Sequence, residues 1–150
     1  MYRKILVPLD GSKDAEGVIP LVQGELAPDG EAIVLQIIPP GKSQSFGGQV
    51  FLGSQREDAD RSRAQAYLKG VLRRVDADPQ QWRCDVSVSE SVARGIVDFA
   101  AREKADLIAM YTHDRKGLAA FIKKSIAKDV LRRAQIEVKV FTPKELAVGV

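Results

Sequence analysis

The heptapeptide "AIVLQII" (residues 32–38) is an almost unbroken apolar run, interrupted by a single glutamine. A half-exposed strand alternates between apolar and polar residues, whereas a strand buried on both faces is apolar throughout. Two other runs have the same continuous character, "KILVPLD" (4–10) and "DLIAMYT" (106–112). We therefore predict that these three segments are central strands of a sheet that is covered on both sides.

Two further runs alternate and are predicted to be edge strands, namely "RCDVSVS" (83–89) and "IEVKVF" (136–141). Between the strands, apolar residues recur at spacings of three and four, which is typical of amphipathic helices. Strand and helix thus alternate along the whole chain, and this alternation predicts an α/β protein with a parallel sheet. The predicted helices lie within residues 15–26, 64–75, 92–100 and 122–130.

Placing the alternating runs at the edges selects one order of strands. Right-handed crossovers leave few topologies, and the order 3-2-1-4-5 puts the three continuous runs in the centre. The flavodoxin-like order 2-1-3-4-5 would instead expose "AIVLQII" at an edge. With 150 residues, 45% of them hydrophobic, the chain suits one domain spanning 1–150: an open, five-stranded, Rossmann-like parallel sheet with helices on both faces.

Two segments interrupt this pattern. Pro20 falls inside the first predicted helix, where it is expected to kink the helix and to remove a backbone hydrogen bond. The segment "PPGKSQSFGGQVFLGSQ" (39–55) is rich in Gly, Ser and Pro and has no helical period. We expect a disordered loop there, with a mobile cover over a ligand site as the alternative.

Composition excludes several classes of protein. No apolar run is long enough to span a bilayer, and the beginning of the sequence lacks a signal-peptide pattern, so we expect a cytoplasmic protein without a membrane partner. The single cysteine excludes a disulfide within the chain and a multi-cysteine metal site. His113 is the only histidine, so no other histidine is left for a Ser/His/Asp triad if His113 serves another purpose. The net charge of +3 is concentrated in residues 113–133. Because no aromatic platform or helix-turn-helix accompanies it, we interpret it as a solvated helix face and do not expect nucleic-acid binding.

The predicted strand order also places a ligand crevice. In open parallel sheets, ligands bind beyond the carboxyl ends of the strands where the winding reverses, here between strands one and four. The loops at that point are "LDGS" (9–12) and "YTHDRKG" (111–117). The carboxylate of Asp10 is expected to project into the crevice, where it can bind a base, a ribose or hydrated magnesium, or merely stabilise the turn. Ser12 is expected to cap the following helix.

Three stretches carry a family resemblance over nearly the full chain: "KILVPLDGS", "ADLIAMYTHDRKG" and "SIAKDVLRRAQIEVKVF". They resemble the universal stress protein family, and the resemblance implies an adenine nucleotide alpha hydrolase-like fold. In that family a glycine motif often follows the fourth strand and holds ATP: G-x-x-G, nine residues, then G and Ser or Thr. The resemblance implies a nucleotide site at Pro8, Asp10, Ile37, Met110, Tyr111, Asp114, Lys124 and Ser125, with the backbone of Ile37 meeting adenine.

The spacing of the glycine motif is kept, but its residues are not. Tyr111, Asp114 and Lys124 replace the three glycines, and Ser125 alone is retained. Glycine lets the backbone approach phosphate oxygens, whereas the Tyr111 ring would fill the space beside the strand. Asp114 would repel a phosphate by roughly 4 kcal/mol at about 4 Å and an effective dielectric constant of about 20. Lys124 loses the backbone approach but supplies a cation.

The resemblance therefore implies a stress-response module that does not bind ATP in the usual mode. It implies a homodimer formed through the fifth strand at Val138, Val140 and Phe141, with Phe141 exposed in the monomer, and it leaves room for a further protein partner. No catalytic activity and no cofactor are expected. The alternative is a sensor of ATP with magnesium, in which the side chains of Arg115, Lys116, Lys123 and Lys124 replace the backbone amides.

Overall fold

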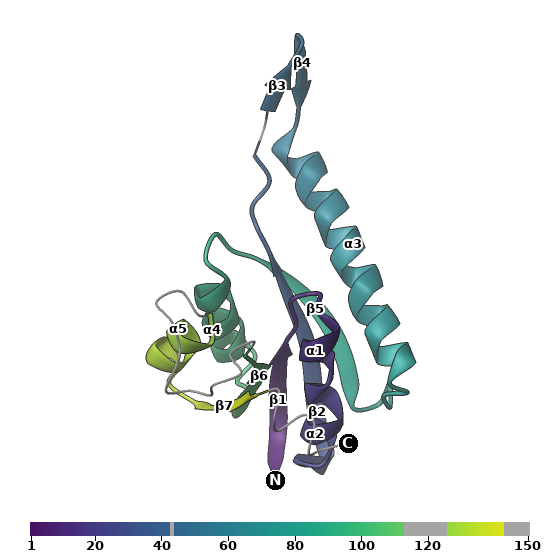
Figure 1. Cartoon of the computed structure of the whole chain (residues 1–150), viewed down its shortest axis with the longest axis vertical. Coiled ribbons are helices and arrows are strands. Elements are labelled where there is room, and N and C mark those ends of the chain that lie inside the picture. Colours follow the sequence, from purple (N-terminus) through teal and green to yellow (C-terminus); the bar gives the residue numbers. More distant parts are fainter. Residues whose placement is uncertain (43, 113–125, 143–150) are drawn as a thin grey trace.

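The computed structural model describes residues 1–42, 44–112 and 126–142. It contains one five-stranded parallel sheet in the order β5-β2-β1-β6-β7 (Figure 1), which is the predicted order 3-2-1-4-5. Each strand pairs in parallel with its neighbours. The strands are β1 (Tyr2–Pro8), β2 (Leu26–Ile38), β5 (Trp82–Val88), β6 (Leu107–Tyr111) and β7 (Glu137–Phe141).

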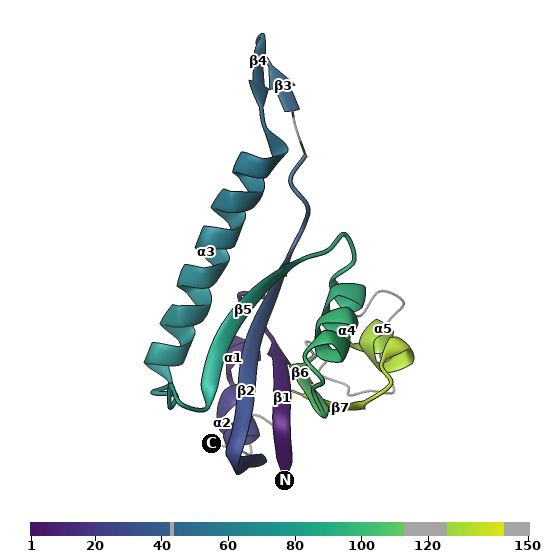
Figure 2. The same cartoon turned by 180° about the vertical axis from the view of Figure 1, so that it is seen from behind.

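Helices cover the two faces of the sheet in separate layers (Figures 1 and 2). One layer consists of α1 (Lys13–Glu16), α2 (Val18–Gln23) and α3 (Gly53–Arg74), and the other of α4 (Val92–Arg102) and α5 (Ile126–Arg133). Each layer buries its own apolar cluster, because successive residues of a strand point to opposite faces. Ile5 and Val7 lie in the α1–α3 cluster, whereas Leu6 lies in the α4–α5 cluster. This double burial explains the unbroken apolar runs.

The first predicted helix is divided into two. α1 ends at Glu16 and α2 begins at Val18, with Gly17 between them. Pro20 is the third residue of α2, in a turn whose backbone N–H groups have no helical acceptor in any case. The predicted loss of a hydrogen bond at Pro20 is therefore wrong. The cap predicted at Ser12 is confirmed, since its side chain accepts a bond from the backbone N of Ala15 at 3.2 Å.

Strand β2 starts earlier than predicted, at Leu26, so the preceding helix ends at Gln23. The pairing with β1 shifts between Tyr2, opposite Leu26, and Lys4, opposite Glu31. Gly30 lies in the shifted stretch, and a Cβ there would stand 2.8 Å from Cδ1 of Leu26. Close packing against Leu26 thus requires glycine at this position. The start of β2 was not predicted because the residues of the shifted stretch do not show the apolar run of a buried strand.

Helix α3 also starts earlier than predicted, at Gly53. The segment before it contains an antiparallel hairpin of β3 (Gln44–Phe46) and β4 (Gln49–Phe51), so the expectation of disorder is wrong for its described residues. Gly47 and Gly48 close the hairpin with φ angles of 55° and 82°, which suit a two-residue turn. The first half of α3 shows no helical period in the sequence because none of its residues after Gly53 is buried before Ala64.

A network of charges ties the sheet to α4. Lys4 on β1 lies 3.6 Å from Glu31 on β2 and 3.8 Å from Glu103, the residue that ends α4. Arg83 on β5 bonds both Glu31 and Glu103. Burial raises the pKa of Glu31, but the bond and charge of Arg83, together with Lys4, outweigh burial and lower this pKa below its ordinary value.

Acid is expected to weaken the fold through Glu31. A carboxyl group with a lowered pKa stabilises the folded state above its ordinary value of 4.5, and this stabilisation is lost as the pH falls through the lower folded-state pKa. The measurement is urea unfolding from neutral pH down to about pH 3. Glu31→Gln should show a shallower loss of stability with acid than the unmodified chain. The matched control Glu90→Gln, at an exposed position, should not; equal slopes for all three proteins would contradict this role.

No helix in the described ranges is both long enough and apolar enough to cross a bilayer. This result agrees with the absence of a long apolar run in the sequence.

Candidate functional site

The loop after β1 and the end of β6 lie at the point where the winding of the sheet reverses. β1 and β6 are adjacent and parallel, so their carboxyl ends share one edge of the molecule. Four of the predicted residues stand there: Pro8 ends β1 half-buried, Asp10 follows exposed, and buried Met110 and half-buried Tyr111 end β6. The structure thus brings these four residues to the same end of the sheet.

Asp10 lies beyond the strand rather than at its last position. Its Oδ1 accepts a hydrogen bond of 2.9 Å from the backbone N of Ser12. Gly11 between them has a φ of 91°, a conformation that favours glycine. One carboxylate oxygen of Asp10 therefore stabilises the turn, which was one of the roles expected for this residue. The same loop is followed directly by α1, which Ser12 caps.

Ile37 combines a packed side chain with an open backbone. A Cβ on Gly95 of α4 would lie 3.0 Å from Cδ1 of Ile37, so helix and strand are in close contact. The bonding between β1 and β2 ends with Leu9 N to Leu35 O at 2.8 Å. Ile37 is the next residue of β2 whose N–H and C=O face the β1 side. Within the described ranges, these two groups have no hydrogen-bond partner.

Gln36 was not among the predicted site residues. It is the one polar residue of the "AIVLQII" run, and its Oε1 is buried without a hydrogen-bond partner in the part of the chain that the structure describes. A buried acceptor without a donor is unfavourable by about 1–3 kcal/mol. The lone glutamine in an apolar strand was the signal in the sequence that could have identified it.

A second group missed by the sequence joins α1 to α3. The Tyr67 hydroxyl donates to Glu16 Oε2 at 3.0 Å, and Arg74 donates to Glu16 Oε1 at 2.7 Å. Burial raises the pKa of Tyr67, and the bond to Glu16 and the charges of Glu16 and Asp10 raise it further. Tyr67 thus remains protonated and holds α3 against α1, beside the loop that carries Asp10.

Tyr111 and Phe141 are paired residues at the ends of β6 and β7. Both are half-buried and pack against the apolar cluster beneath α1 and α2. The expectation that Phe141 is exposed in the monomer is therefore wrong, since its side chain packs against this cluster. Val138 and Val140 are also half-buried, and they pack against the α4–α5 cluster on the other face.

The remaining motif residues fall outside the described ranges. These are Asp114, Lys124 and Ser125, together with His113, Arg115, Lys116 and Lys123. Within the described residues, no group of three His, Cys, Asp or Glu side chains is arranged to hold a metal ion.

The two edges of the sheet differ in how their backbone groups are used. On β5, the bonds of Gln81 and Ser89 to β2 show that the intervening even-numbered residues face outward. At Val86 the outward N–H donates to Asp85 Oδ1 at 2.8 Å, and Arg61 donates to the outward C=O at 3.1 Å. Side chains thus occupy the middle of this edge, a common protection against strand pairing.

Over the residues that the structure describes, the β7 edge lacks this protection. Phe141 accepts a bond from Thr112 N at 3.0 Å and so faces β6, which leaves Val138 and Val140 facing outward. Within the described ranges, the backbone groups of these two valines have no partner. Within the part of the chain that the structure describes, β7 is therefore the edge with free outward backbone groups; the predicted pairing through β7 stays a prediction.

Gly95→Ala is expected to destabilise the fold by about 1–3 kcal/mol. The new Cβ would lie 2.8 Å from Cβ of Ser89 as well as close to Ile37, so α4 must shift away from β2. Thermal unfolding measures the loss. The matched control is Gly70→Ala in α3, where the new Cβ meets only Arg74 Nη1 at 3.6 Å. Gly70→Ala should stabilise by about 0.5–1 kcal/mol; equal effects at both positions would contradict close packing at Gly95.

Comparison with known proteins gives a consistent result. The model of the universal stress protein family matches residues 1–141. Universal stress protein Sll1388 of Synechocystis is 29% identical over 151 residues, which cover 91% of this chain and 96% of that protein. The solved structure of hypothetical protein MJ0577 has a TM-score of 0.67 at 19% identity, covering 95% of this chain and 96% of its own. A universal stress protein in complex with cAMP has a TM-score of 0.67 at 18% identity, covering 95% and 98%.

Proposed function

Because the chain belongs to the universal stress protein family, we propose that it is a stress-response module that acts through self-pairing and protein contacts. In this proposal the chain does not hold ATP in the mode of the glycine motif. The observation that carries the proposal is the position of Tyr111. The first glycine of the motif is replaced by a tyrosine whose side chain packs half-buried against the core, next to Phe141.

The chemistry of the motif supports the same conclusion. A phosphate loop binds through backbone N–H groups that glycine leaves accessible, and Tyr111 and Asp114 replace two of those glycines. Asp114 adds a negative charge where the phosphates would lie. The repulsion of roughly 4 kcal/mol equals the whole binding energy of a millimolar complex, about 4.1 kcal/mol.

Titration of the unmodified chain with ATP and magnesium tests this proposal. A protein that binds ATP is stabilised by about 2.7 kcal/mol when the ligand is at one hundred times its Kd, which a thermal shift assay detects readily. We expect no saturable shift at millimolar ATP. Inorganic pyrophosphate at matched ionic strength controls for nonspecific attraction to the basic residues. A saturable shift with ATP that pyrophosphate does not reproduce would overturn the proposal.

For the self-pairing, the proposal places β7 at a two-fold interface. The outward backbone groups of Val138 and Val140 support it, because an open edge strand is a template for a second copy. The opposite edge is a poorer candidate, since Asp85 and Arg61 occupy the outward groups of Val86.

Val140→Pro is expected to convert the dimer into a monomer. Proline removes one outward N–H without removing a bond to β6, so the strand itself can persist. Light scattering coupled to size-exclusion chromatography gives the mass. The matched control is Val88→Pro on β5, which also removes an outward N–H and should leave the dimer intact. A Val140→Pro protein with the mass of the unmodified chain would exclude pairing through β7.

A nucleotide sensor is the second candidate, favoured by the open backbone of Ile37. One N–H and one C=O beside each other can read the edge of a nucleobase, and a structural neighbour was solved in complex with cAMP. The phosphates would then be held by Arg115, Lys116, Lys123 and Lys124 in place of backbone amides. If ATP does bind, Arg115→Gln with Lys116→Gln should weaken it, whereas the surface change Arg94→Gln on α4 should not.

We also propose that the chain has no catalytic activity of its own. In the sequence, the loops 9–12 and 111–117 carry Asp10 and His113, without a recognisable pair of base and nucleophile. Incubation with ATP and magnesium should release no ADP above the rate without protein; sustained release would contradict this proposal.

A further inference from the structure

The β5 edge of the sheet is closed at its centre, at Val86. The outward N–H of Val86 donates to Asp85 Oδ1 at 2.8 Å, and its outward C=O accepts a bond of 3.1 Å from Arg61 on α3. The outward backbone groups of Cys84 and Val88, on either side, have no hydrogen-bond partner in the ranges that the structure describes. The protection of this edge therefore depends on the side chains of Arg61 and Asp85.

Arg61 belongs to a part of α3 that has little packing of its own. The first half of this helix and the β3–β4 hairpin before it project beyond the sheet (Figures 1 and 2). No residue of α3 between Gly53 and Ala64 is buried. Helices derive most of their stability from the packing of an apolar face, so we expect this half of α3 to open more readily than the rest of the fold.

The residues of β5 are suited to pairing with a second β5 in one register. In an antiparallel pair about a two-fold axis at Val86, Cys84 of one copy faces Val88 of the other, and the outward groups of all three residues can bond. On the other face of the strand, Asp85 then lies opposite Ser87. A register that pairs Cys84 with Val86 would instead place Asp85 opposite Asp85, and like charges directly opposite each other are destabilising.

The contacts of Arg61 and Asp85 lie at the axis of this register. Both outward groups of Val86 are bonded to side chains of the same chain, so each copy would have to break these bonds before two β5 strands could pair. The contacts therefore oppose the register that the charges of β5 favour.

We propose that Arg61 and Asp85 form a latch that prevents β5 from pairing antiparallel with β5 of a second copy, and that the latch opens when the first half of α3 moves away from this edge. β5 and β7 are the opposite edges of the sheet. If both edges paired, one sheet would continue from copy to copy without closing. The latch thus limits assembly to the dimer through β7, and this last step rests on the function proposed above.

Removal of the latch tests this inference in the Val140→Pro protein, whose β7 edge is blocked. The latch variant combines Arg61→Ala with Asp85→Ala and frees both outward groups of Val86. Because neither copy then has to break its own bonds, we expect self-association about tenfold tighter than in the Val140→Pro protein alone. Analytical ultracentrifugation over a range of concentrations measures this change.

Two further variants separate strand pairing from nonspecific association. Arg63→Ala removes an arginine of the same helix whose described ion pair is with Asp60 of α3 itself, so it should not increase self-association. Val88→Pro, added to the latch variant, removes an outward N–H without removing a bond to β2, and it should abolish the pairing. Circular dichroism checks that each variant keeps its helices and strands.

The outcomes separate the latch from the pairing through β7. A latch variant that sediments like Arg63→Ala at every concentration would overturn the proposal, as would an association that Val88→Pro does not reduce. In the chain that keeps Val140, the latch variant should form assemblies larger than the dimer. If Val140→Pro leaves the dimer intact, the pairing through β7 fails, whereas the comparison of the latch variant with Arg63→Ala still decides whether the latch exists.

Discussion

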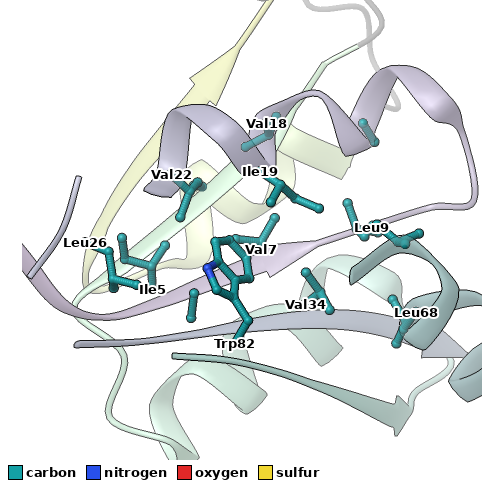
Figure 3. Packing of buried hydrophobic residues seen from close by; sticks show 14 of the residues in the cluster. Ile5, Val7, Leu9, Val18, Ile19, Val22, Leu26, Val34, Leu68 and Trp82 are labelled. Carbon is teal, nitrogen blue, oxygen red and sulfur yellow. The ribbon is translucent and has the colours of Figure 1, made fainter. Parts of the chain in front are cut away.

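Trp82→Ala is expected to lower the free energy of unfolding by about 3–5 kcal/mol. Trp82 begins β5, is 4% exposed and lies in the apolar cluster beneath α2, close to Ile5 and Val34 (Figure 3). Its indole Nε1 donates to Gln23 Oε1 at 2.6 Å, so it joins the edge of the sheet to the end of α2. Truncation removes the largest side chain of this cluster and leaves a cavity between the sheet and α2.

Trp82→Phe is the matched control. It keeps most of the apolar volume but loses the donor, so we expect a smaller loss, of which the hydrogen bond accounts for about 0.5–1.5 kcal/mol. Urea unfolding followed by circular dichroism gives both values, since Trp82 is the only tryptophan and its fluorescence is lost with it. Equal losses for the two variants would mean that the bond to Gln23, and not the volume, determines the effect.

Placing glycine at the three positions that match the family's glycine motif is expected to create ATP binding. In the protein that combines Tyr111→Gly, Asp114→Gly and Lys124→Gly, the backbone regains its approach to phosphate and the charge of Asp114 is gone. Removal of roughly 4 kcal/mol of repulsion corresponds to about a thousandfold gain in affinity. Isothermal titration with ATP and magnesium measures the gain directly against the unmodified chain.

Single changes separate the affinity from the stability of the triple variant. Tyr111→Gly alone should unfold more easily, because the ring packs against the core beside Phe141. Asp114→Gly alone should recover much of the affinity without that loss of packing. A triple variant that is folded and yet binds no ATP would show that the glycine motif is not what prevents binding, and would direct attention to Asp10 and its turn.

Local patterns in the sequence predicted the architecture well. The continuous run at 32–38 lies in β2, between β1 and β5, and the alternating runs at 83–89 and 136–141 are the two edges. These predictions succeed because a strand that is buried on both faces is apolar throughout, whereas a strand that is buried on one face alternates between apolar and polar residues. The same logic located the cap at Ser12, which depends on residues close together in the chain.

Predictions that depended on distant neighbours were less successful. Phe141 was expected to be exposed because its strand alternates, but it packs half-buried against the apolar cluster on the α1–α3 face of the sheet. The start of α3 was missed because its first half contacts no core, so no apolar period marks it. Gln36, Tyr67 and Glu16 meet their surroundings across segments that are far apart in sequence, and no local pattern connects them.

The sequence by itself determined the order of the strands and therefore the point at which the winding of the sheet reverses. The tertiary structure decided that Tyr111 packs half-buried against the core and that Asp10 is bonded within its own turn. It also decided that, within the described residues, side chains occupy outward backbone groups of β5 but not those of Val138 and Val140 on β7. The physical reason is that periodicity records which face of an element is buried, whereas the partner of a side chain or a backbone group is set by elements brought together only when the chain folds.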